Sequence, residues 1–62
     1  MEKLVIKIGS FYKGVDNEVI EVTNIYAEFP VFWIHWKDLK TGETDMHNLE
    51  EFLGWVVEEV VL

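Results

Sequence analysis

The stretch from Val31 to Leu39 reads VFWIHWKDL, and its pattern decides how the rest of the chain is interpreted. In a strand, successive side chains point to opposite sides of the sheet. One side of this segment would be wholly apolar, and we expect it to face the core: Phe32, Ile34 and Trp36. The other side would present Val31, Trp33 and His35. An aromatic surface is therefore expected, unless this strand is covered on both sides.

The same alternation with period two recurs before and after this stretch. It appears over residues 3–8, 18–26 and 43–47, and apolar β-branched residues dominate 55–62. These patterns predict strands. Turn-forming residues separate them at 9–10, 15–17, 27–30 and 40–43. Within 18–26, one face of the strand is expected to carry Ile20, Val22, Asn24 and Tyr26.

The period changes after residue 47. Asn48 is followed three residues later by Glu51, the spacing of a capping box at the start of a helix. Gly54 suits the position that ends a helix. The pattern predicts one helical turn over residues 48–54 with an apolar face made of Leu49, Phe52 and Leu53.

Four to five short strands in 62 residues, with one helical turn before the last strand, predict a mostly β fold and a single domain over residues 1–62. Closing the sheet into a small barrel would give every strand an inward face. The stretches GSFYKG, EVIEVTNI, KTGE and LEEF resemble small SH3-like barrel proteins of bacterial and phage type. The matching residues are Gly9, Tyr12, Val22, Gly42, Leu49 and Phe52. This resemblance implies an SH3-like barrel of antiparallel strands and a phage origin, and it carries no catalytic residue.

Composition limits the possible classes of protein. The chain has no cysteine, which excludes disulfides and thiolate metal sites. No apolar run approaches the roughly 18 residues that span a bilayer. The first four residues lack the basic start of a signal peptide. We therefore expect no membrane association and a cytoplasmic location, in the host cytoplasm if the protein is phage-encoded.

Catalysis and metal binding are not expected. Ser10 is the single serine, and the sequence shows neither a nucleophile with its base nor a glycine-rich phosphate loop. His35 and His47 would approach each other if their strands pair, and with Asp45 they would offer three ligands. Further ligands at a fixed spacing are missing. We expect no enzyme activity, no metal and no cofactor.

Charge is unevenly distributed. Twelve acidic and five basic residues give a net charge of −7, and residues 41–62 hold acids but no lysine or arginine. Nucleic-acid binders use Lys and Arg to neutralise phosphates, so direct nucleic-acid binding is not expected. Acids also keep a small aromatic-rich protein soluble. The alternative is an acidic surface that steers the protein to a basic partner, made of Glu43, Asp45, Glu50 and Glu51.

Aromatic residues supply the second candidate surface. The expected patch consists of Tyr12, Tyr26, Trp33 and His35. Aromatic faces beside carboxylates accept cationic side chains. The sequence therefore predicts a non-catalytic acidic protein-binding module whose partner is a host or assembly protein. Its leading specific role is that of a phage-type inhibitor that occupies a basic or nucleic-acid-binding site of a host protein. The alternative is a structural adaptor or homo-oligomer, for example a homodimer, that assembles through the aromatic patch and the C-terminal strand.

Overall fold

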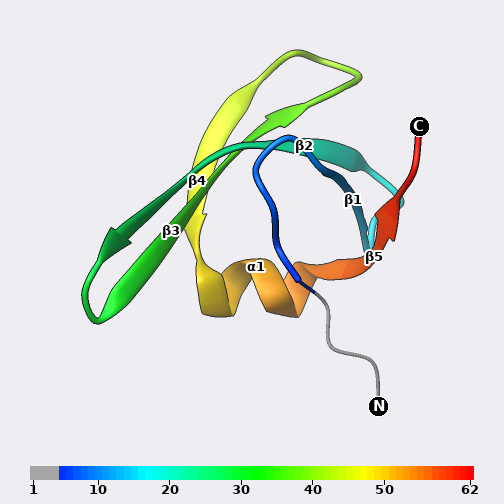
Figure 1. The fold of residues 1–62 in the computed structure, drawn as a ribbon. Coiled ribbons are helices and arrows are strands. Elements are labelled where there is room, and N and C mark those ends of the chain that lie inside the picture. The colour runs from blue at the N-terminus through cyan, green and yellow to red at the C-terminus, as the bar shows by residue number, and fades with distance from the viewer. Residues whose placement is uncertain (1–4) are drawn as a thin grey trace.

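The computed structural model describes residues 5–62, which form one antiparallel sheet and one short helix (Figure 1). The elements are β1 (Phe11–Gly14), β2 (Val19–Glu28), β3 (Val31–Asp38), β4 (Thr44–Asn48), α1 (Leu49–Trp55) and β5 (Val56–Val60). The strand order is β4-β3-β2-β1-β5. After four consecutive strands, α1 carries the chain from the β4 edge to the β1 side, where β5 pairs with β1.

The mostly β prediction and the helical turn before the last strand are confirmed. Closure into a barrel is not seen, because β4 and β5 are the two edges of the sheet within residues 5–62. In the same part of the chain, no helix is long and apolar enough to cross a membrane.

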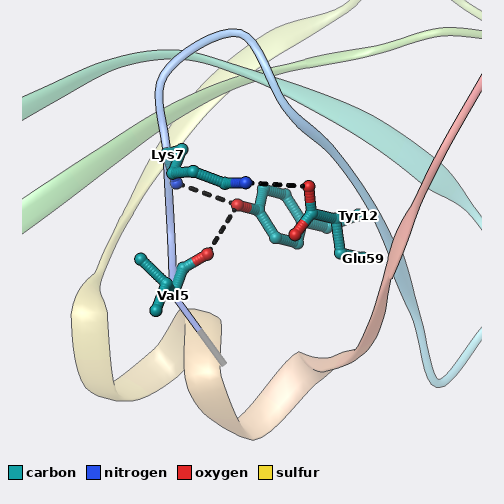
Figure 2. Close-up of polar contacts among 4 residues, drawn as sticks. All are labelled: Val5, Lys7, Tyr12 and Glu59. Atoms are coloured by element: carbon teal, nitrogen blue, oxygen red, sulfur yellow. Dashed lines mark hydrogen bonds and ion pairs between the residues drawn. The ribbon is translucent and has the colours of Figure 1, made fainter. Parts of the chain in front are cut away.

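The first predicted strand differs from the structure. Residues 5–8 are not in a strand, and residues 3 and 4 lie outside the described residues. The strand forms instead over Phe11–Gly14, between the predicted turns at residues 9–10 and 15–17. The physical reason is that the Tyr12 hydroxyl holds the preceding segment. It accepts a hydrogen bond from Lys7 N (2.8 Å) and donates one to Val5 O (2.9 Å), as Figure 2 shows.

The core lies between the sheet and α1. Among residues 5–62, five apolar side chains are buried: Tyr12, Ile20, Val22, Ile34 and Phe52. Tyr12 and Phe52 meet edge to face, with ring centroids 5.8 Å apart. Such pairs are favourable beyond the area that they bury. Tyr12 was expected in the exposed aromatic patch, and that prediction is wrong because its ring is fully buried and its hydroxyl is satisfied inside the fold.

A β-bulge in β2 changes which side chains face the core. Val22 pairs with Trp36 but Asn24 pairs with His35, so one residue, Thr23, has no opposite partner. An extra residue reverses the alternation that follows it. Ile25 therefore packs against the core. Tyr26, predicted on the face of Ile20 and Val22, is instead 51% exposed.

The predicted faces of β3 are partly correct. Ile34 is buried and Trp36 packs against the core, as expected. Phe32 shares their side of the strand but is 42% exposed. It pairs with Ala27 near the end of the β2–β3 hairpin, which projects away from the rest of the sheet (Figure 1).

The helix begins as predicted and ends later. Asn48 Oδ1 accepts a hydrogen bond from Glu51 N (2.8 Å), and Glu51 Oε1 accepts one from Asn48 N (3.4 Å), which completes the capping box. Gly54 lies inside α1 and does not end it. The helix continues to Trp55, and the N–H of Val56 bonds to Phe52 O before the chain enters β5.

Candidate functional site

A hollow of about 320 Å³ opens between α1 and the sheet. We call it the acidic hollow. Its lining comes from the β1–β2 turn, from β2, β3 and β4, and from α1, so five segments of the chain meet there. The lining residues are Asp16, Glu18, Ile20, Trp36, Asp38, His47, Glu51, Phe52 and Trp55.

Trp36 and His47 form one flat wall of the acidic hollow. Trp36 Nε1 donates a hydrogen bond to His47 Nδ1 (3.0 Å). The planes of the two rings differ by only 5°, with centroids 5.7 Å apart. An N–H···N bond of this kind lies in the plane of both rings, so the rings lie side by side and not face to face. Because Nδ1 is the acceptor, neutral His47 carries its proton on Nε2.

Trp55 forms a second aromatic wall. Its indole Nε1 donates to Asp16 Oδ2 (3.2 Å), and its ring lies 5.9 Å from that of Phe52. The indole rests against the backbone of Gly14, where a Cβ atom would overlap the ring. Glycine at this position therefore allows the indole to approach β1 closely enough to line the hollow.

Asp38 is the buried carboxyl group of the site. It is only 7% exposed, and its Oδ1 accepts hydrogen bonds from Lys40 N (2.7 Å) and Thr41 N (3.0 Å). Hydrogen bonding to the Glu18 carboxyl lowers the pKa of Asp38, and the two backbone donors lower it further. Asp38 therefore stabilises the β3–β4 turn through its hydrogen bonds and also places a negative charge in the lining of the hollow.

Glu18 lies beside Asp38, and each carboxyl group changes the pKa of the other. The hydrogen bond to Asp38 and then the repulsion between the two carboxylates raise the pKa of Glu18, with smaller contributions from desolvation and from Asp16. Lys40 acts in the opposite direction. Glu18 is itself held by its backbone N–H, which donates to Asp16 Oδ1 (3.1 Å).

The acidic hollow is therefore suited to a cation. Four carboxyl groups line it, and among residues 5–62 no lysine does so. Carboxylates form their strongest hydrogen bonds with charged donors, and aromatic faces attract cations. Lys40 lines a second, more open depression, which shares Asp16, Glu18 and Asp38 with the hollow.

The predicted acidic residues are placed differently. Of the four, Glu51 lines the acidic hollow. Asp45 pairs in register with Trp36 but is exposed outside the lining, and Glu43 and Glu50 are also exposed outside it. Asp16, Glu18 and Asp38 were not among the predicted site residues. Asp38 had a detectable signal, since an aspartate before a glycine-containing turn often accepts backbone hydrogen bonds.

Three of the four predicted aromatic residues lie together. Tyr26 pairs directly with Trp33 across the hairpin, and its ring meets that of His35 edge to face at 4.6 Å. They lie on the side of β3 opposite to the core-facing Ile34. We call these three residues the hairpin patch.

The two histidines lie on opposite sides of the sheet. His35 pairs with Met46 while the adjacent Ile34 pairs with His47, and neighbouring pairs in a ladder alternate in direction. The approach of the histidines considered from the sequence is thus not seen. Within residues 5–62, no three His, Asp or Glu side chains are arranged to hold a metal ion.

Comparison of the chain with protein-family models, with curated proteins and with solved structures finds no match. Function must therefore be argued from the geometry of the acidic hollow and the hairpin patch.

Proposed function

We propose that the protein is a non-catalytic protein-binding module that takes a cationic side chain of its partner into the acidic hollow. The observation that carries the proposal is the combination of four carboxyl groups and two tryptophan rings around one hollow. Solubility explains carboxylates that project into water. It does not explain Asp38, which is nine-tenths buried in the lining.

The partner, on this proposal, is a protein with a basic surface. A net charge of −7 steers such a partner toward the chain, and the hollow then provides a specific contact. Blocking a basic or nucleic-acid-binding site of a host protein, as a phage-type inhibitor in the host cytoplasm, is the specific role that we propose. The likeness to SH3-like barrels remains part of this proposal, in a sheet whose strands β4 and β5 are not paired with each other.

The proposal is tested by affinity capture with charge-matched variants. The double variant Asp16→Asn/Glu18→Gln removes two charges from the hollow, and Glu43→Gln/Glu50→Gln removes two from outside it. Capture from host lysate at low salt should be lost for the first variant and kept for the second. Equal capture by both would show that the hollow is not the contact.

A second candidate function is assembly through the C-terminal edge. β5 is an edge strand of the sheet, and Val57 is 57% exposed on it. Val61 and Leu62, which follow it, are 93% and 76% exposed. Exposed apolar edge strands pair readily with other chains. Light scattering after size exclusion tests this: a dimer that Val57→Lys converts to a monomer supports assembly, and a monomeric wild type removes this candidate.

A further inference from the structure

We propose that the group held in the acidic hollow is an arginine side chain, stacked on the plane of Trp36 and His47 and paired with the carboxyl groups of Glu18 and Asp38. The inference rests on the proposed function, since it names the chemistry of the partner group. It concerns the same site and distinguishes a guanidinium group from a lysine ammonium group.

The flat wall is the first argument. Trp36 and His47 differ in plane by 5° and are joined edge to edge by a hydrogen bond, so together they present an extended planar surface. A guanidinium group is planar and weakly hydrated, and it stacks on such surfaces. An ammonium group is compact and strongly hydrated, and it gains less from a flat wall.

The arrangement of the carboxyl groups is the second argument. Both backbone donors to Asp38 bond to Oδ1, so Oδ2 accepts neither of them, and Asp38 and Glu18 both line the hollow. Two neighbouring carboxyl groups offer several acceptor oxygens at separate positions. The five N–H donors of guanidinium form a fork that spans two acceptors, whereas an ammonium group acts as a point charge.

The volume of the hollow and the charged groups around it are the third argument for an arginine side chain. About 320 Å³ lies near the lower end of the roughly 300–1,000 Å³ typical of ligand pockets, which suits one side chain and not a folded segment. A cation paired with the two carboxyl groups would offset the repulsion that raises the pKa of Glu18. Asp16, Glu51 and His47 also face the hollow, and Lys40 acts on Glu18 from beside it.

The test is a titration followed by NMR of the three tryptophan indole N–H groups. The probes are N-acetyl-arginine methylamide, the corresponding lysine compound and the citrulline compound, at equal ionic strength. Citrulline keeps the shape of arginine without its charge. The arginine probe should shift the Trp36 and Trp55 signals. The signal of Trp33 in the hairpin patch is the internal control and should stay in place.

The expected affinities have a set order. The arginine probe should bind about tenfold more tightly than the lysine probe, and the citrulline probe should not bind. Affinity for the arginine probe should rise with pH as Glu18 loses its proton. Glu18→Gln should weaken binding and remove this pH dependence, whereas Glu28→Gln, at the far end of β2, should do neither.

Equal affinity for arginine and lysine probes, or shifts of Trp33 alone, would overturn the inference. Failure of the inference and failure of the proposed function give different results. If the arginine probe leaves Trp36 and Trp55 unchanged while partner capture still depends on Asp16 and Glu18, the function stands and arginine is excluded. If the probe binds in the hollow while capture ignores these residues, the arginine site stands and the proposed function falls.

Discussion

At the scale of single residues, most of the site depends on side chains that do two things at once. Asp38 holds a turn and supplies charge. Tyr12 fills the core and holds the preceding segment through its hydroxyl. Gly14 contributes by having no side chain, which lets Trp55 reach its place. Each of these residues gives a prediction.

Adding a methyl group at Gly14 should disturb the site more than any exposed change. Gly14→Ala forces the Trp55 indole away from β1, and overpacking of this kind costs about 1–3 kcal/mol. Gly54→Ala is the matched control, because a Cβ there meets open space inside α1 and should stabilise by about 0.5–1 kcal/mol. Urea unfolding measures both changes. A neutral Gly14→Ala would mean that Trp55 does not pack on β1.

The hydroxyl of Tyr12 should contribute measurably to stability. Tyr12→Phe keeps the ring but leaves Lys7 N and Val5 O without this partner, for a loss of about 1 kcal/mol. Hydrogen exchange at Lys7 should become faster. Tyr26→Phe, at an exposed ring, is the control and should change neither quantity. Unchanged protection of Lys7 in Tyr12→Phe would refute the arrangement in Figure 2.

The carboxyl pair predicts a specific dependence of stability on pH. Because the pKa of Glu18 is raised in the folded protein, its contribution to folding stability is complete below pH 4.5, its unperturbed pKa. That contribution is lost as the pH rises through the pKa of the folded state. Because the pKa of Asp38 is lowered in the folded protein, its contribution to folding stability is present above pH 3.8, its unperturbed pKa. That contribution is lost as the pH falls through the pKa of the folded state.

Between pH 3.8 and pH 4.5, the two unperturbed pKa values, Asp38 and Glu18 both make their full contribution to folding stability. The stability of the wild type relative to Glu18→Gln should therefore decrease as pH rises above 4.5. Urea melts of the two proteins from pH 4 to 7 measure this difference, with Glu28→Gln as control. A difference that stays constant over that range would show that folding does not raise the pKa of Glu18.

At the scale of elements, features set by a few neighbouring residues were predicted correctly from the sequence, whereas the register of the strands was not. The Asn48–Glu51 capping box and the turn over residues 40–43 were found because each depends on a few neighbouring residues. The bulge at Thr23 was not, because the alternation of β2 continues through it in the sequence. That single extra residue moved Ile25 inward and Tyr26 outward.

The helix cap gives the prediction at this scale. Asn48→Ala removes the acceptor for Glu51 N and should destabilise the protein by about 1 kcal/mol. Asn48→Asp keeps an acceptor at the same place and should restore most of the loss. Denaturant midpoints of the two variants decide the matter, and equal midpoints would show that the cap contributes nothing.

At the scale of the whole molecule, the sequence indicated a surface of acidic and aromatic residues but not where in the fold these residues meet. Acids and aromatic residues were expected to meet a cationic partner, yet the expected acids all came from residues 41–62. The fold instead gathers Asp16, Glu18 and Asp38 from earlier in the chain with Glu51 of α1. Such a gathering depends on long-range contacts between β2, β3 and α1, which no local pattern in a single sequence records.

The most direct test of the account is the dissociation constant of the purified, captured partner for two variants of equal charge. Asp16→Asn/Glu18→Gln should weaken binding by about tenfold or more, since charge-assisted contacts contribute about 1.5–3 kcal/mol each. Glu43→Gln/Glu50→Gln should change it by less than about threefold, because neither carboxyl group lines the hollow and isolated surface charges contribute little. If the two variants bind the partner equally well at the same salt concentration, the acidic hollow is not where the partner's cation is held.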